Sequence, residues 1–140
     1  MRKLSYIFLL ISLNFIFSNT AFAQIDSITN LCSEYLQPPY ISDGQQYSAL
    51  LNRDEVAEFH ATFYGGSTYR IVGFCGLQKG NLEITVYDEE RNVLFTNTDY
   101  NNIPYWDFKF NSTINCIIEA KIDSKNITSG IAVLLIGFIQ

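Results

Sequence analysis

Apolar and polar side chains alternate along most of this chain, in short runs that are separated by Gly, Asn and Asp. An alternation with a period of two places one set of side chains on each face of a β-strand. In Glu55–Tyr64, for example, small and aromatic side chains occupy one face, and Glu58, His60 and Thr62 occupy the other. The pattern predicts eight strands, over Gln46–Leu51, Glu55–Tyr64, Thr68–Phe74, Leu82–Tyr87, Val93–Thr96, Tyr105–Phe110, Ile114–Ile122 and Gly130–Phe138.

Strands that follow one another at intervals of about 10 residues, with turn residues between them, are typical of a sandwich or a barrel. We therefore expect one all-β domain over Gln45–Gln140, an antiparallel β-sandwich of the jelly-roll type. The last strand is nearly all apolar, which predicts that both of its faces are covered. Gln24–Gly44 precedes the domain as an N-terminal extension. Within it, Ser27–Leu36 predicts a short helix that the two following prolines end.

The first 23 residues predict a secretory signal peptide. Arg2 and Lys3 form a basic start, an apolar run follows over Tyr6–Phe17, and Ala21-Phe22-Ala23 supplies the small-x-small pattern before the cut. The apolar run is too short to remain in a bilayer as a spanning helix. We expect cleavage after Ala23, a secreted or periplasmic protein, and no membrane insertion after cleavage.

The charge of the chain limits the classes of partner that it can bind. Nine Lys and Arg residues face 14 Asp and Glu residues, and loss of Arg2 and Lys3 leaves seven basic residues and a net charge of −7. Such a surface repels phosphate backbones and anionic lipids, which disfavours nucleic acid. The expected partner is an extracytoplasmic protein or a polysaccharide.

Three cysteines remain after the predicted cut, and an oxidising compartment favours one disulfide with one thiol left over. Cys75 shares a strand face with Tyr69 and Ile71, and Cys116 shares one with Ile118. Both cysteines are therefore expected to point inward, and a Cys75–Cys116 bridge is the preferred pairing. A bridge from Cys32 to either of them stays open.

The order of motifs from Glu55 to Phe138 resembles the bacterial pre-peptidase C-terminal (PPC) domain and related jelly-roll modules. The likeness rests on Gly65-Gly66 after Phe63, on Thr68–Ile71, on Leu82–Asp88 with its polar turn, and on Gly130 before the last strand. Domains of this kind are commonly appended to secreted hydrolases. The resemblance implies an accessory or binding module, and it supplies no catalytic residues.

The best candidate for ligand contact is the loop before the sixth strand. Tyr100, Asn101, Asn102 and Tyr105 combine aromatic faces, which stack on sugar rings, with amides, which bond sugar hydroxyls. Trp106 follows on the inward register with Phe108 and Phe110 and is expected in the core.

An acidic turn and a histidine are the other candidates. Asp88, Glu89, Glu90 and Asn92 offer a dense set of oxygens that would suit a structural calcium ion, the one cofactor left open. His60 and Glu58 share a strand face, but no nucleophile motif accompanies them and two residues do not complete a metal site.

The sequence thus favours a secreted, non-enzymatic β-sandwich that recognises an extracytoplasmic partner or ligand on a rigid scaffold. One alternative is a carbohydrate-binding module that uses the Tyr100–Tyr105 loop. Another is a structural or assembly protein of the envelope. A small hydrolase built on His60 and Glu58 is the least favoured, and no catalytic residue is assigned.

Overall fold

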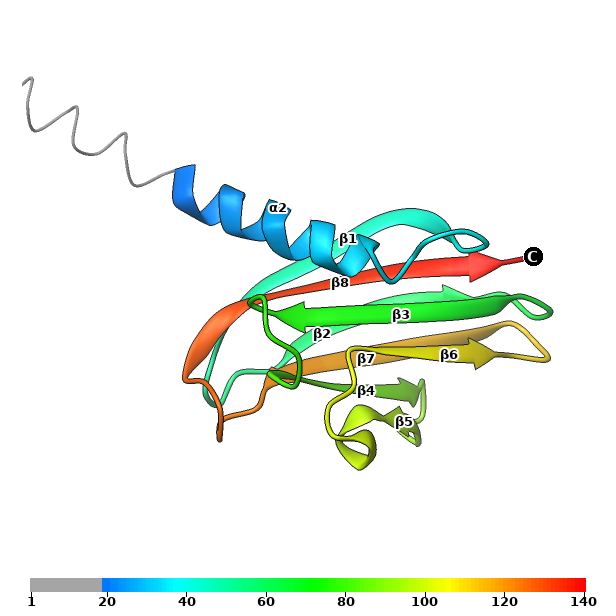
Figure 1. Cartoon of the computed structure of the whole chain (residues 1–140). Coiled ribbons are helices and arrows are strands. Elements are labelled where there is room, and N and C mark those ends of the chain that lie inside the picture. The colour runs from blue at the N-terminus through cyan, green and yellow to red at the C-terminus, as the bar shows by residue number, and fades with distance from the viewer. Residues whose placement is uncertain (1–18) are drawn as a thin grey trace, which may run out of the picture.

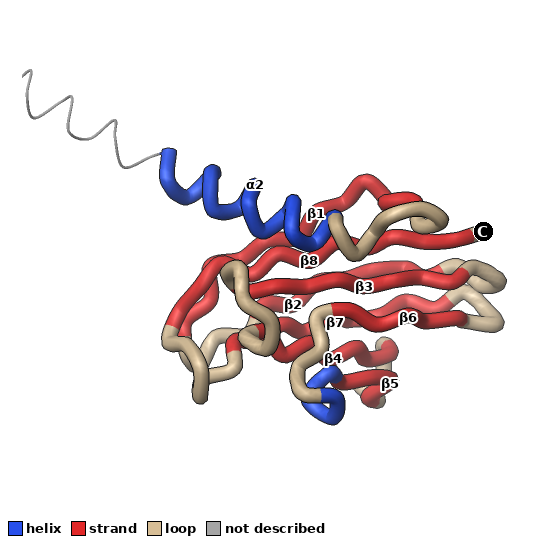
Figure 2. The backbone as a smooth tube through the Cα atoms, viewed as in Figure 1, coloured by secondary structure: helices blue, strands red, loops and turns tan. Residues whose placement is uncertain are grey.

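The computed structural model describes residues 19–140, which form one helix and two four-stranded antiparallel sheets (Figures 1 and 2). The helix is α2 (Asn19–Ser33), and a single 3-10 turn, η1 (Asn97–Tyr100), precedes the sixth strand. The strands are β1 (Ile41–Asn52), β2 (Ala57–Phe63), β3 (Thr68–Cys75), β4 (Leu82–Asp88), β5 (Val93–Thr96), β6 (Tyr105–Lys109), β7 (Ile114–Ile122) and β8 (Ser129–Ile139).

The strand order is β1-β8-β3-β6 in one sheet and β2-β7-β4-β5 in the other. Every neighbouring pair is antiparallel. The chain passes between the sheets after most strands, which is how two Greek keys build a jelly roll. The predicted eight-stranded antiparallel sandwich is confirmed, and the strand bounds differ from the predicted ones mainly at β1, which begins at Ile41 instead of Gln46.

The main core lies between the two sheets, because alternate residues of each strand face inward. Phe63 on β2, Ile118 on β7 and Leu134 on β8 are each no more than 1% exposed. Trp106 lies opposite Ile71 in the register of β3 and β6, so it faces inward as predicted. It is half-buried on an edge strand, however, and does not belong to the core in which it was expected.

A second, smaller core lies on the outer face of the β1-β8-β3-β6 sheet, where α2 covers β8 and β3 (Figure 1). Ile28 and Cys32 of the helix pack there on Val72, Phe74 and Val133. The middle of β8 is consequently buried on both faces, which confirms the expectation drawn from its continuous apolar run.

The first 18 residues of the predicted signal peptide lie outside the described residues, and its last five begin α2. Residues 20–24 of the helix are all exposed, and the first fully buried side chain of the helix is Ile28. The contact between helix and sheet therefore starts after the predicted cleavage point at Ala23. No helix among the described residues has the length and apolar content needed to cross a membrane.

The structure corrects the predicted disulfide: Cys75 and Cys116 face the main core as expected, but both thiols are free, as is that of Cys32. Gly73, two residues before Cys75, faces Leu82, which pairs with Ile122 at that end of the sandwich. Cys116 lies six positions from Ile122 along β7, about 20 Å at the rise of a strand. A disulfide needs Cα atoms within about 7 Å, so the bridge does not form. The alternation in the sequence indicates which face of a strand a cysteine occupies, but not where along the sandwich that cysteine lies.

Candidate functional site

A cleft opens where β1 and β2 form neighbouring edges of the two sheets. Its volume is about 580 Å³, within the usual range for ligand sites of about 300–1,000 Å³. The start of β1, the end of β2 and the end of β8 meet there, at the end of the sandwich where Figure 1 marks the C-terminus. Its lining consists of Asp43, Gln45, Tyr47, His60, Ala61, Thr62, Phe63, Tyr64, Ser67, Tyr69, Ile136, Phe138 and Gln140.

A bulge in β1 forms the rim of this edge cleft. The register of β1 against β8 shifts between Ser42 and Gln46, and Gly44 between them has a φ of 82°, which favours glycine. The Ser42 hydroxyl accepts a hydrogen bond from the Gly44 N–H at 3.1 Å, and the Asp43 carboxylate accepts one from the Gln45 N–H at 2.8 Å. These local bonds hold Asp43 at the mouth of the cleft.

Aromatic side chains form the inner wall. The rings of Tyr47 and Phe59 meet at 5.1 Å and join the two sheets behind the opening. Phe63 contacts Tyr69 edge-on at 4.9 Å, and the Tyr69 hydroxyl accepts a hydrogen bond from the Tyr64 N–H at 3.0 Å. The Tyr47 hydroxyl donates to Gln45 Oε1. The cleft therefore combines aromatic surface with amide and carboxylate groups.

The cleft carries a single carboxylate side chain, that of Asp43. Partial burial raises the pKa of the Asp43 carboxyl, and burial together with the nearby Asp43 charge raises the pKa of Tyr47. Asp43 forms none of the ion pairs found among the described residues, and no Lys or Arg side chain is among the residues that line the cleft. A cation is thus the charge that this surface lacks.

His60 lines the edge cleft, and Glu58 lies beside it on the outer face of the β2-β7-β4-β5 sheet. His60 Nε2 is 3.1 Å from Glu58 Oε1, and the second Glu58 oxygen receives Arg91 Nη2 at 2.6 Å. The Arg91 hydrogen bond lowers the pKa of Glu58. Arg91 also reaches Glu119 at 2.5 Å. Glu58 is therefore engaged in a surface ion-pair network.

The predicted saccharide loop is divided between two sides of the molecule. The Tyr100 ring packs on Trp106 at 4.5 Å, at the edge where β5 and β6 meet. Tyr105 points the other way, toward the connection between α2 and β1, and meets Tyr35 at 5.4 Å. Neighbouring residues on a strand face opposite sides, so Trp106 and Tyr105 separate.

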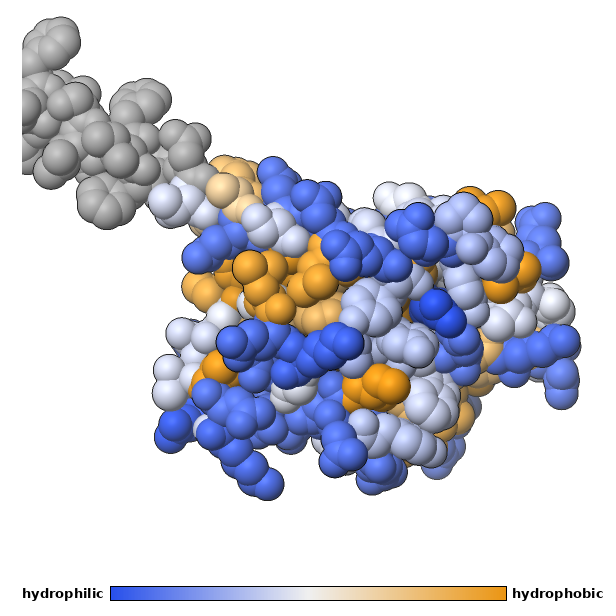
Figure 3. Space-filling model, viewed as in Figure 1, coloured by the Kyte–Doolittle hydropathy of each residue, from blue (hydrophilic) through white to orange (hydrophobic). Residues whose placement is uncertain are grey.

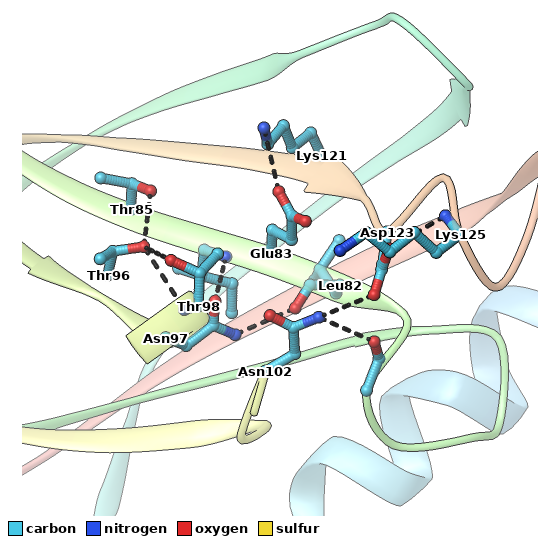
Figure 4. Close-up of polar contacts among 12 residues, drawn as sticks. Leu82, Glu83, Thr85, Thr96, Asn97, Thr98, Asn102, Lys121, Asp123 and Lys125 are labelled. Carbon is cyan, nitrogen blue, oxygen red and sulfur yellow. Dashed lines mark hydrogen bonds and ion pairs between the residues drawn. The ribbon is translucent and has the colours of Figure 1, made fainter. Parts of the chain in front are cut away.

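The two asparagines of that loop complete its turn, and Figure 4 shows the hydrogen bonds of Asn102. Asn101 and Asn102 have φ values of 56° and 53°, in the left-handed region that asparagine tolerates. The Asn102 amide donates to the Gly80 carbonyl at 3.1 Å and to Asp123 Oδ2 at 3.2 Å. Its hydrogen bonds thus serve to hold three loops together.

The acidic turn between β4 and β5 is closed by its own members. Asp88 accepts hydrogen bonds from the backbone N–H and the side-chain amide of Asn92, both at 2.8 Å, and these bonds lower its pKa. Glu89 receives the Asn115 amide at 3.3 Å, and Glu90 is exposed. Within residues 19–140, no three His, Cys, Asp or Glu side chains gather as a metal site. The calcium ion stays a prediction.

A second cleft, of about 360 Å³, lies between the start of α2 and the β1-β8-β3-β6 sheet, where β3 ends and β8 begins. It is lined by apolar residues such as Ile28, Leu77 and Ile131, and Figure 3 shows apolar side chains gathered beside the helix. Ala23 and Gln24 form part of its wall and flank the predicted cleavage point. Cleavage after Ala23 would remove part of this wall, so the shape of the second cleft depends on whether the predicted signal peptide has been cut off.

Sequence reasoning missed the edge cleft because it assigned Asp43 to the N-terminal extension and read Tyr47 as one position of a short strand. The Ser42-Asp43-Gly44 run carries a turn signal that marks the bulge. No sequence pattern, however, indicates that this bulge lies beside the end of β2.

No protein-family model matches the chain, and no curated protein matches its sequence. Among solved structures, the chain is similar to PliG of Aeromonas hydrophila, a periplasmic lysozyme inhibitor of g-type lysozyme. The TM-score is 0.53 at 9% identity, and the match covers 70% of this chain and 90% of PliG. A de novo designed double-stranded β-helix aligns with a TM-score of 0.35 at 13% identity, over 66% of this chain and 97% of the design. The likeness to PliG shows a shared β-sandwich fold.

Proposed function

We propose that this chain is a non-enzymatic binding module that acts outside the cytoplasm and recognises a protein. The observation that carries the proposal is the edge cleft. It is a tyrosine-lined opening with the Asp43 carboxylate at its mouth, between two free strand edges, in a sandwich whose other edge is closed by stacked rings. Such an opening offers both side chains and backbone groups to a partner. The predicted signal peptide supports a location outside the cytoplasm.

The fold shared with PliG supports the same class of function, since PliG is a periplasmic inhibitor of another protein, g-type lysozyme. By this analogy, the proposed partner is an extracytoplasmic hydrolase, with a lysozyme as the first to test. The chain carries a formal net charge of −5, and a basic partner would meet complementary charge. Membership of the PPC-like group, on which the sequence resemblance rests, stays a prediction and is compatible with a binding module.

The test is capture by the tagged secreted protein from an extracytoplasmic extract, with cross-linking and identification by mass spectrometry. We expect one dominant protein that untagged chain displaces. Inhibition of a g-type lysozyme by the purified chain is measured in parallel. Absence of a displaceable protein partner, with retention of the chain on polysaccharide instead, would contradict the proposal.

A saccharide-binding function is the second candidate, because the Tyr100 ring is 48% exposed and rests on Trp106. Its test is retention on a panel of insoluble and surface polysaccharides. If it holds, Tyr100→Ala loses retention while Tyr105→Ala, whose ring faces the other side, keeps it. Equal retention by both variants and the unaltered chain would exclude this loop.

A further inference from the structure

The free edge of β2 is a continuous one. β2 pairs with β7 alone over Ala57–Phe63, so about half of its backbone N–H and C=O groups point away from the sheet. The Tyr69 hydroxyl covers the N–H of Tyr64, the residue that follows the strand, and so ends the open row. An uncovered row of alternating donors and acceptors is a template for an added strand.

The three other edge strands are less suited to such pairing. The edge of β1 is interrupted by the bulge at Asp43 and Gly44. β5 has four residues and an irregular register against β4, and β6 has five. The edges of β5 and β6 are also bridged by the rings of Phe95 and Trp106, at 4.7 Å. Gln46–Asn52 of β1 also pairs without interruption, but among these four strands it is β2 that is regular over its whole length and borders the cleft.

The charges and rings beside this edge indicate which side chain would enter the cleft. Asp43 lies at the mouth without a cationic partner among the described residues. The half-buried Tyr47 lines the interior beside the buried Tyr69, and the face of a tyrosine ring attracts a cation. A lysine or arginine would therefore find a carboxylate at the entrance and aromatic surface inside.

We propose that the free edge of β2 pairs with an extended peptide segment of the partner, and that a lysine or arginine side chain of this segment enters the cleft beside Asp43. The inference rests on the proposed function and assigns the site of recognition. Main-chain hydrogen bonds to Ala57–Phe63 supply affinity, and the cation supplies specificity. A saccharide lacks the regular series of amides that the edge would engage, so a peptide is the favoured occupant.

The experiment begins with selection of a random heptapeptide library on the purified secreted protein. We expect the retained peptides to share one Lys or Arg at a fixed position, with β-branched or aromatic residues at alternate positions around it. The best synthetic peptide is then measured by fluorescence anisotropy. Asp43→Asn should weaken its binding at least about tenfold. Asp54→Asn, an exposed carboxylate at the opposite end of β1 and β2, should leave it unchanged.

Backbone pairing is tested on the peptide, so the protein stays intact. Two versions are N-methylated at alternate amides, one at the odd positions and one at the even positions. Only one set of amides faces β2, so one version should lose binding and the other should keep it. Equal binding of both versions, retained peptides without a cation, or an unchanged affinity of Asp43→Asn would overturn the inference. If glycans displace the labelled peptide and unlabelled peptides do not, the cleft is assigned to a saccharide, and the inference is overturned as well.

The captured partner separates this inference from the proposed function. If the Asp43→Asn chain captures the same protein with undiminished affinity, the partner binds elsewhere: the proposed function stands and the inference falls. If the unaltered chain captures no protein, the proposed function falls whatever the peptides show.

Discussion

Arg70 on β3 and Asp107 on β6 lie directly opposite each other and form a two-pronged ion pair. Arg70 Nε is 2.6 Å from Asp107 Oδ1, and Nη2 is 2.8 Å from Oδ2. The guanidinium also lies over the rings of Tyr40 and Tyr105, at 4.2 and 4.6 Å, and donates to the Tyr35 carbonyl at 3.0 Å. One arginine thus attaches the connection between α2 and β1 to the sheet.

The first prediction concerns this pair. The Arg70 hydrogen bond holds the pKa of Asp107 below its ordinary value of 3.8. A lowered carboxyl pKa adds stability that is fully present above 3.8 and is lost as the pH falls through the lowered value. We expect Asp107→Asn to reduce the free energy of unfolding at pH 7 by about 1 kcal/mol, since the pair is partly exposed.

Urea unfolding at pH 7 and at acid pH measures that effect. The difference in unfolding free energy between the unaltered chain and Asp107→Asn should shrink in acid. The residue at position 107 is then uncharged in both proteins. Asp54→Asn serves as the control and should show no such difference. A difference that stays constant across pH would show that the pair adds no pH-dependent stability.

The three thiols give a second prediction. Burial raises the pKa of Cys32 to about 12 and those of Cys75 and Cys116 to about 11, so few thiolates form at neutral pH. Alkylation of the folded protein should label no cysteine quickly. Alkylation in denaturant without reductant should label all three, read by intact mass. A single label in denaturant would instead show that two cysteines are bridged.

Asn97 provides the third prediction. This side chain is 1% exposed and accepts the Ile84 N–H at 2.7 Å. It donates to the Leu82 carbonyl at 2.9 Å (Figure 4) and to the Ile103 carbonyl at 3.1 Å. Asn97→Ala leaves buried backbone groups without partners. We expect a loss of about 2–4 kcal/mol of unfolding free energy. Asn30→Ala, at an exposed helix position, should change it by less than about 0.5 kcal/mol. Equal effects would mean that water replaces the Asn97 bonds.

The fourth prediction tests the junction at α2. Removal of all residues before Gln24 takes away Thr20–Ala23 of the helix, which are all exposed, and should leave the melting temperature nearly unchanged. Ile28→Ala, in the same shortened chain, removes a side chain that is 3% exposed and should cost about 2–4 kcal/mol. The intact mass of the secreted protein should correspond to a chain that begins at Gln24. A large loss on truncation would instead assign a structural role to the first turns of the helix.

The alternation of side chains predicted most of the fold, because a period of two is a local property that survives into the sheet. It assigned all eight strands, the inward faces of Cys75, Cys116 and Trp106, and the double burial of β8. A helix was expected over Ser27–Leu36, and the observed helix overlaps it but begins and ends earlier, at Asn19 and Ser33. These features depend on neighbours along the chain.

Tertiary structure decided the rest, since contacts between distant segments leave no periodic signal. It separated Cys75 from Cys116 along the sandwich, although both face the same core. It turned Tyr100 and Tyr105 to different sides of the molecule. It also brought Asp43 beside the end of β2 to form the edge cleft. The sequence by itself determined which face each strand buries, whereas the order of strands in the two sheets decided which exposed groups meet.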